Sequence, residues 1–328
     1  MNNWKNVWIF AQTQRGKLSP TAFELLTAGR QLADALHEKL AAVLIGNNVS
    51  AFAQQLIDCG ADIVYTCEHP DLENYIDDVY AGVLAKMIRD YQPNKFLLPA
   101  TNMGRSLSAK TAVFAGTGLT ADATEVVIHP EDGQLHATRP TFGGNLMATI
   151  TCAHTRPEMC SLRPMSYEKA RPVQGRKGEV VAVPFEPAQF ISPVQFVEFI
   201  KTQGDNLDLS EAEVIVAGGR GVGKQEGFTL LEKLATRLGG AVAASRAAVD
   251  NGWIDYRYQI GLTGRTVKPK IYIACGISGQ IQHMAGMSGA DVIVAINKDP
   301  QAPIMQLAHY AVEGDLYEVI PAMLEALK

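Results

Sequence analysis

The sequence predicts an α/β protein with two domains, each containing a mostly parallel sheet flanked by helices. Three observations support this prediction. The chain has 328 residues, which is long for one compact core. Short apolar runs typical of buried strands alternate with amphipathic helical patterns. This alternation occurs twice, on either side of a proline-containing stretch, so we expect an N-terminal α/β domain over residues 1–190, a linker over 191–212 and a second domain over 213–328.

The first domain begins with strands and helices in alternation. Ser19 precedes Pro20, a pair that favours a helix start capped by the serine, and apolar residues then recur at three- and four-residue spacing. The strands expected here are 7–11, 42–45, 62–66 and 96–100. Because the strand runs are apolar throughout, their sheet should be covered on both faces.

Further along, the pattern changes twice. Between residues 124 and 183 we expect strands without long helices between them, at 125–128, 146–151 and 180–183. Three prolines between residues 184 and 193 and a polar stretch over 202–210 favour a connection. A second series of strands follows, expected at 214–219, 241–244, 271–275 and 292–296.

Composition excludes several classes of protein. With 29 basic and 34 acidic residues, the chain has no electrostatic footprint for nucleic acid. Its apolar runs are far shorter than the roughly 20 residues of a membrane-spanning helix. The N-terminal residues match neither a signal peptide nor a transit peptide, so we expect a soluble cytoplasmic protein, of prokaryotic type, with no membrane insertion.

The five cysteines do not form a recognisable framework. Their number is odd and no C-x-x-C pair occurs, which argues against disulfides, a zinc site or an iron–sulfur site. We expect reduced, mostly buried thiols and no metal site.

A glycine-rich segment over residues 218–225 has the G-x-x-x-x-G-K spacing of a phosphate-binding P-loop. However, Gln225 replaces the Ser or Thr that binds magnesium in that motif. The acidic Walker-B segment that accompanies a P-loop is not evident either. The glycines also miss the G-x-G-x-x-G spacing of a dinucleotide fingerprint, which makes an NAD-dependent dehydrogenase a weaker interpretation. A glycine-rich turn between a strand and a helix still allows a ligand to approach the backbone closely. A P-loop-like nucleotide-binding hydrolase therefore remains the alternative function.

Three segments carry the most specific information. Residues 243–250 (AASRAAVD), 275–283 (CGISGQIQH) and 295–300 (AINKDP) occur in this order over the last third of the chain. In sequence and spacing they resemble the flavin domain of the electron-transfer flavoprotein alpha subunit. The resemblance implies a Rossmann-like FAD-binding domain and an electron carrier without catalytic residues of its own.

The same resemblance implies the cofactor contacts. Arg246 would lie against the flavin ring, where a guanidinium stabilises the one-electron-reduced anionic form, Thr263 would donate a hydrogen bond near N5, and His283 would place a donor or a cation near the C2 carbonyl. Leu262 stands where mitochondrial members carry glutamine, so no side-chain contact is implied there. The implied set is Arg220, Ser245, Arg246, Gln259, Ile260, Gly261, Leu262, Thr263, Ser278, Gly279, Gln280, Ile281, Gln282, His283, Asn297, Asp315 and Leu316.

Each of these residues also has an ordinary interpretation. Arg246 could form an i, i+4 surface pair with Asp250, and His283 could be a packed core histidine. Asn297 could be a turn residue and Asp315 a helix cap. Ser278 and Gly279, in contrast, have a functional interpretation from their position. They follow a strand and open a short helical stretch, so their backbone N–H groups could hold a pyrophosphate.

Partners follow from the resemblance alone. Residues 117–122 and 139–145 are similar to prokaryotic family members, including those of NADH-linked electron-bifurcating systems. The resemblance implies a heterodimer with an electron-transfer flavoprotein beta subunit, which would carry AMP or a second FAD and contact the N-terminal domain. An acyl-CoA dehydrogenase or a related flavoenzyme would exchange electrons with it.

Overall fold

The computed structural model describes residues 4–14, 16–141, 146–198, 209 and 212–327. The chain divides into two compact units, Met1–Phe199 and Ile200–Lys328. Most of the expected linker, including the polar stretch over 202–210, lies outside the described residues, so the linker boundaries stay a prediction. In the first unit, Phe190 stacks on Phe185 at 5.3 Å between ring centroids, and the Ser192 hydroxyl donates to Asp78.

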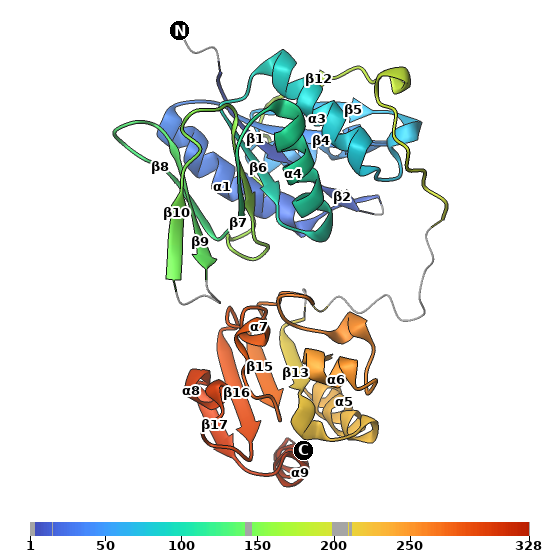
Figure 1. The fold of residues 1–328 in the computed structure, drawn as a ribbon, viewed down its shortest axis with the longest axis vertical. Helices are drawn as coiled ribbons and strands as arrows, with labels where there is room; N and C mark the ends of the chain where they lie inside the picture. The colour runs from blue at the N-terminus through green and yellow to red at the C-terminus, as the bar shows by residue number, and fades with distance from the viewer. Residues whose placement is uncertain (1–3, 15, 142–145, 199–208, 210–211, 328) are drawn as a thin grey trace. The chain divides into compact units, whose positions relative to one another are not determined.

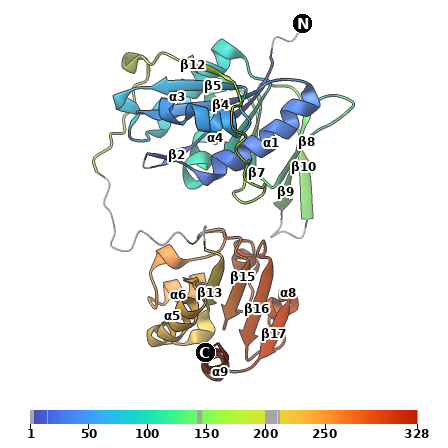
Figure 2. The ribbon, with the colours of Figure 1, turned by 180° about the vertical axis from the view of Figure 1, so that it is seen from behind.

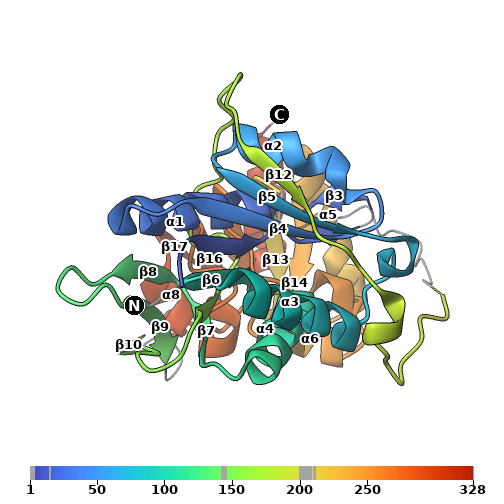
Figure 3. The ribbon, with the colours of Figure 1, turned by 90° about the horizontal axis from the view of Figure 1, so that it is seen from above.

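The first unit is built on a seven-stranded sheet whose strands are all parallel (Figures 1 and 3). In spatial order its strands are β12 (Glu179–Ala182), β5 (Ile63–Glu68), β4 (Leu40–Gly46), β1 (Val7–Phe10), β6 (Lys95–Pro99), β11 (Glu158–Leu162) and β7 (Leu119–Ala123). The strands expected from apolar runs are confirmed within a few residues, but the sequence pattern did not identify β7 and β11.

Helices cover both faces of this sheet, as Figure 3 shows. On one face lie α1 (Pro20–Leu36) and α2 (Ala53–Asp58), and on the other lie α3 (Asp77–Tyr91) and α4 (Asn102–Ala115). The helix expected after Ser19 is confirmed, with Pro20 in its first turn. Its expected cap is not formed, because the Ser19 hydroxyl lies 2.8 Å from the Thr21 hydroxyl and bonds no backbone N–H.

A smaller antiparallel sheet is attached to the first unit. It contains β8 (Glu125–Ile128), β9 (Leu135–Thr141) and β10 (Leu146–Ile150), in the order β10-β9-β8. A two-stranded hairpin of β2 (Thr13–Gln14) and β3 (Lys17–Leu18) completes the strands described here. The β-rich region expected between residues 124 and 183 is therefore present, divided between two sheets.

The second unit has a five-stranded, wholly parallel sheet. Its spatial order is β14 (Ala241–Ala244), β13 (Val214–Gly218), β15 (Ile271–Cys275), β16 (Val292–Asn297) and β17 (Tyr310–Glu313). In chain order this is 2-1-3-4-5, the order of flavodoxin-like doubly wound sheets, so a switch point lies between the first and third strands. Figure 2 shows β15, β16 and β17 side by side.

Helices also flank the second sheet. The helices α5 (Phe228–Arg237) and α9 (Leu316–Ala326) pack on one face, and α8 (Pro303–Leu307) packs on the other. Two further helices, α6 (Arg246–Asp250) and α7 (Ile281–Met284), are single turns that follow β14 and β15. Over both units, the short 3-10 helices within the described residues are Val49–Phe52, Pro70–Leu72, Pro187–Gln189, Arg220–Val222, Gln225–Gly227 and Tyr256–Tyr258.

None of the helices in the described part of the chain combines the length and the apolar character that crossing a membrane requires. All five cysteines carry free thiols, and only Cys152 is partly exposed. Burial raises the pKa of Cys275 to about 12 and that of Cys67 to about 11, which makes both thiols poor nucleophiles.

Candidate functional site

The second unit contains a cavity of about 680 Å³ at the carboxyl ends of β14, β13, β15 and β16. Ligands of open α/β sheets collect at this edge and at the switch point. Many residues implied by the flavoprotein resemblance line this cavity: Arg220, Ser245, Arg246, Gln259, Ile260, Gly261, Leu262, Thr263, Ser278, Gln280, Gln282, His283 and Asn297. Segments up to 77 residues apart in the sequence are thus brought together by the parallel sheet.

Glycines join the two loops that follow β13 and β15. The Gly221 N–H donates to the Gly276 carbonyl at 2.9 Å, and the Gly219 N–H donates to Cys275 at 2.9 Å. A Cβ on Gly219 would lie 2.3 Å from the Gly276 oxygen, and one on Gly221 would lie 2.7 Å from Gly276 Cα. The glycine-rich run therefore serves close backbone packing beneath the cavity.

This geometry does not support the P-loop alternative. The helix expected after the glycine run is present as α5, which begins at Phe228, but two 3-10 helices, Arg220–Val222 and Gln225–Gly227, lie between it and β13. Lys224, the lysine of the apparent motif, is exposed and is not among the described residues that line the cavity.

Two arginines and two aspartates, Asp250 and Asp299, line the cavity. Arg220 comes from the loop after β13 and Arg246 from the start of α6. The Arg246 Nε lies 3.3 Å from Asp250 Oδ2, and the two side chains are 68% and 62% exposed. The ordinary surface pair is therefore present, but an exposed pair of this kind contributes little stability, so Arg246 is available for an anionic ligand.

The loop between Gln259 and Thr263 is held from several sides. The Leu262 N–H donates to the Gln282 carbonyl at 2.8 Å, and a Cβ on Gly261, at φ +141°, would lie 2.8 Å from the same oxygen. The buried Gln259 amide donates to Thr263 Oγ1 at 2.9 Å. Because that oxygen accepts a hydrogen bond from Gln259, the Thr263 hydroxyl proton is left to donate to a ligand.

His283 is buried and both of its ring nitrogens have protein partners. Nδ1 lies 3.1 Å from the Ile260 carbonyl, which can only accept, so Nδ1 carries the proton. Nε2 must then accept from the Tyr272 hydroxyl, 2.9 Å away. Burial lowers the pKa of His283 to about 4, so the ring is neutral near pH 7. The structure therefore disfavours the cation that the sequence analysis allowed at this position.

Four implied residues are outside the cavity lining. Gly279, at φ +86°, is buried, and a Cβ there would lie 2.3 Å from the Ile304 nitrogen. Ile281 is 39% exposed in α7. Because α7 has only four residues, it gives little support to a pyrophosphate site at 278–279. Leu316 is in the core. Asp315 caps α9 by accepting from Tyr317 N at 2.9 Å and pairs with Lys298 at 2.8 Å. Their contacts with a cofactor stay predictions.

The structure also adds residues that sequence reasoning missed. Tyr272 was assigned only to an apolar strand, although a buried tyrosine hydroxyl generally needs a partner. Asn297 donates to the Ile277 carbonyl at 2.8 Å, which places Ile277 at the cavity as well. The other additions to the lining are Gly221, Ala247, Asp250, Gly276, Asp299 and Ala302. Most of them directly follow the ends of predicted strands. Their position at the carboxyl edge of the sheet could therefore have identified them from the sequence.

Comparison with known families agrees with this geometry. The electron transfer flavoprotein domain model matches residues 7–188, and the electron transfer flavoprotein FAD-binding domain model matches residues 208–288. The chain belongs to the electron transfer flavoprotein family. The second match spans cavity residues from Arg220 to His283, and the resemblance inferred from the sequence is confirmed.

Individual members of this family are similar over the whole chain. Protein FixB of Clostridium saccharobutylicum is 47% identical, covering 99% of this chain and 97% of its own length. An electron transfer flavoprotein subunit alpha of Thermoanaerobacterium thermosaccharolyticum is 46% identical, covering 100% and 99%. The lactate dehydrogenase (NAD(+),ferredoxin) subunit LctC of Acetobacterium woodii is 39% identical, covering 99% and 77%.

Proposed function

We propose that this chain is the alpha subunit of a heterodimeric electron-transfer flavoprotein and holds one FAD in the cavity at the carboxyl edge of β13 to β16. The observation that carries the proposal is the convergence of the family's flavin segments on this one cavity. Its volume of about 680 Å³ is within the usual range of cofactor sites, roughly 300–1,000 Å³.

The extent of the cavity along the sheet edge supports an elongated dinucleotide as the ligand. It extends from the end of β14 to the end of β16, which is three strand spacings, or roughly 14 Å. At one end lie Arg246 and Ser245, and at the other lie Asn297 and Asp299. We assign the flavin ring to the Arg246 end and the adenosine half to the Asn297 end, in a Rossmann-like binding mode across the switch point. Asp315 would contact the adenosine half only after its ion pair with Lys298 is broken.

Side chains at the ring end would control where negative charge is stable. FAD, when bound, supplies a ring that takes up and releases electrons. The Arg246 guanidinium and the Thr263 hydroxyl would face the side of the cavity where that charge develops, and preorganised donors of this kind favour charge without reorganising. The neutral His283, fixed by Tyr272 and Ile260, would shape the cavity wall without adding a charge.

Partners are assigned by analogy with the relatives. The name of the Acetobacterium relative links it to NAD⁺ and ferredoxin, and the Thermoanaerobacterium relative is named as a subunit. We infer a beta-subunit partner carrying AMP or a second FAD, an electron donor such as NADH acting through that subunit, and an acyl-CoA dehydrogenase or related flavoenzyme as the exchange partner, all in the cytoplasm.

Replacing Arg246 tests this function. In the heterodimer, Arg246→Ala should weaken FAD binding roughly 10- to 100-fold, as expected when a charge-assisted contact is lost. Arg246→Lys should recover only part of the affinity, because it lacks the planar guanidinium. Lys233→Ala, on the exposed face of α5 and away from the cavity, is the matched control.

The measurement is FAD retention, followed by visible absorbance and by titration of the flavin-free heterodimer. A wild-type heterodimer that stays colourless after reconstitution with excess FAD would refute the proposal. Equal affinity for FAD in the Arg246→Ala and Lys233→Ala proteins would remove the role assigned to Arg246.

A further inference from the structure

A cluster of ligand-type side chains lies on the β8–β9 hairpin of the first unit. His129 follows β8, Asp132 lies in the turn, and His136 lies within β9. One possible ligand atom from each side chain lies within 4.8 Å of the other two. These three residues are separate from the flavin site, because the described residues that line that cavity all belong to the second unit.

The hairpin register explains why the two imidazoles meet. His136 is directly opposite Val127 in the antiparallel ladder, and His129 is two residues beyond Val127 on the same face. The two rings stack with centroids 4.6 Å apart and planes 19° apart. Backbone hydrogen bonds from His129 to Gln134 and from Gly133 to His129 close the turn.

One of the three ligand distances matches that of a shared metal ion, and all three candidate ligand atoms lie within 4.8 Å of one another. Ligands about 2.0–2.2 Å from a tetrahedral zinc ion are roughly 3.3–3.5 Å from one another. His129 Nδ1 and Asp132 Oδ1 are 3.4 Å apart. His129 Nδ1 is also shut off from solvent and has no hydrogen-bond partner among the described residues, which is unusual for a buried polar atom.

Asp132 is prepared for a ligand role. Its Oδ1 accepts from the Gln134 N–H at 2.9 Å, which fixes the orientation of the carboxylate.

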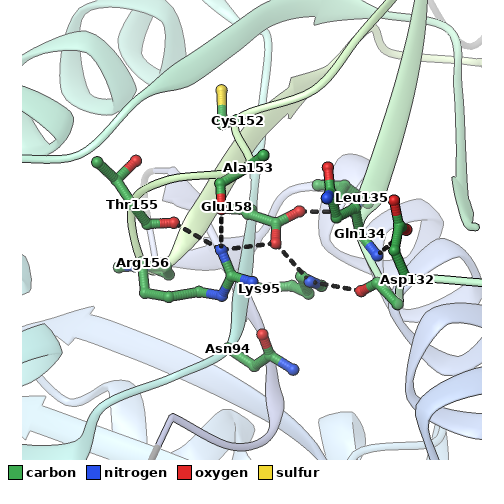
Figure 4. A network of polar contacts seen from close by, with 12 residues as sticks. Asn94, Lys95, Asp132, Gln134, Leu135, Cys152, Ala153, Thr155, Arg156 and Glu158 are labelled. Atoms are coloured by element: carbon green, nitrogen blue, oxygen red, sulfur yellow. Dashed lines mark hydrogen bonds and ion pairs between the residues drawn. The ribbon is translucent and has the colours of Figure 1, made fainter. Parts of the chain in front are cut away.

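A buried ion pair anchors the turn that carries these ligands. Figure 4 shows Lys95 and Glu158 in contact, with Nζ and Oε1 2.7 Å apart and both side chains 1% exposed. Lys95 also donates to the Gly133 carbonyl at 2.9 Å, and Glu158 accepts from the Leu135 N–H at 2.5 Å. The backbone between Asp132 and His136 is therefore fixed to the main sheet, which lowers the cost of ordering a metal site.

We propose that His129, Asp132 and His136 bind one divalent transition-metal ion of the zinc class. Two imidazole nitrogens and one carboxylate oxygen suit Zn²⁺ and its neighbours, whereas Ca²⁺ and Mg²⁺ prefer all-oxygen ligands. Three protein ligands leave a position for water or for a group from another molecule. Bound there, the ion links the end of β8 to β9 and stabilises the hairpin. The expectation of no metal site rested on cysteine spacing and did not consider this His-Asp-His pattern.

The test uses the full-length chain, without an affinity tag and stripped with a chelator, titrated with Zn²⁺ by calorimetry. We expect one equivalent to bind, with affinity at least roughly tenfold weaker in His129→Ala and in His136→Ala. His154→Ala, an exposed histidine outside the cluster, should bind like the wild type. Asp132→Asn, which preserves the side-chain shape, should also weaken Zn²⁺ binding. It replaces the histidine variants in this test if one of them misfolds.

Co²⁺ spectra identify the ligand type. Binding at the proposed site produces no sulfur-to-metal charge-transfer band, because it contains no thiolate. Absence of saturable one-to-one Zn²⁺ binding, equal affinity in the His136→Ala protein and the wild type, or a thiolate band from a cysteine site would each overturn the proposal. Urea midpoints measured with chelator present establish that each variant is folded.

Discussion

At the scale of single residues, His283 shows how burial determines a protonation state. Its two nitrogens contact the Tyr272 hydroxyl and the Ile260 carbonyl, and burial lowers its pKa to about 4. Sequence reasoning placed this residue near the flavin but could not assign its charge, because the neutral state results from burial, which the local sequence does not determine. The imidazole ring is therefore neutral, is held in one orientation by its two hydrogen bonds, and forms part of the cavity wall.

This shift predicts a pH dependence of stability. An unfolded histidine titrates near pH 6.5, so between about pH 6.5 and about pH 4 the unfolded chain binds a proton that the native chain does not. Stability therefore falls as the pH drops through this range, by roughly 3 kcal/mol from this group. His283→Asn, which keeps a donor toward Ile260, should lose most of that dependence.

Urea unfolding at about pH 7.5 and about pH 4.5 measures the difference. The control is His154→Asn, an exposed histidine, which should retain the wild-type dependence. If His283→Asn and the wild type lose equal stability on acidification, the neutral state assigned to His283 is wrong.

At the scale of elements, the pairing of β6 with β11 includes a buried ion pair that no local sequence pattern predicts. Lys95 and Glu158 are fully buried, 63 residues apart, on adjacent strands whose register aligns them. Desolvation lowers the pKa of Lys95. Strand β11 went unrecognised because Glu158 and Ser161 interrupt its apolar run, and only the neighbouring strands supply their partners. Strand β17 was missed for another reason, since it is an exposed edge strand.

Removing one partner of this pair should be costly. Glu158→Leu leaves Lys95 buried without a counterion and the Leu135 N–H without an acceptor, so we expect a loss of roughly 3–5 kcal/mol. The double variant Lys95→Met with Glu158→Leu should recover part of it, because the fully buried ammonium is gone. Arg156, which lies 2.9 Å from Glu158 and is 21% exposed, also loses its carboxylate in both variants and keeps only its hydrogen bonds to the Ala153 and Thr155 carbonyls. Urea unfolding of both variants supplies the comparison, and equal losses would contradict this account of the pair.

At the scale of the whole molecule, each unit has its own hydrophobic cores. Those of the first unit lie on the two faces of its seven-stranded sheet, and those of the second lie on the two faces of its five-stranded sheet. The proposed flavin cavity and the proposed metal cluster lie in different units. Ligands that bind one folded unit stabilise that unit by mass action.

Calorimetry of the full-length chain should therefore resolve two transitions that respond to different ligands. FAD should raise the midpoint of the second unit, and Zn²⁺ should raise that of the first. His136→Ala provides the control, since it should abolish the Zn²⁺ response and preserve the response to FAD. A single transition that both ligands shift equally would show that the units unfold together.

Several properties could be predicted from the sequence alone. The alternation of apolar strands and amphipathic helices identified two parallel-sheet units, and the segments around Arg246, His283 and Asn297 identified the family. These signals are local, because side-chain periodicity and short motifs are properties of neighbouring residues. Tertiary structure alone decided the strand order, the cavity, the neutral state of His283 and the pairing of Lys95 with Glu158. Each of these depends on electrostatic and packing partners that are distant in the chain and become neighbours only on folding.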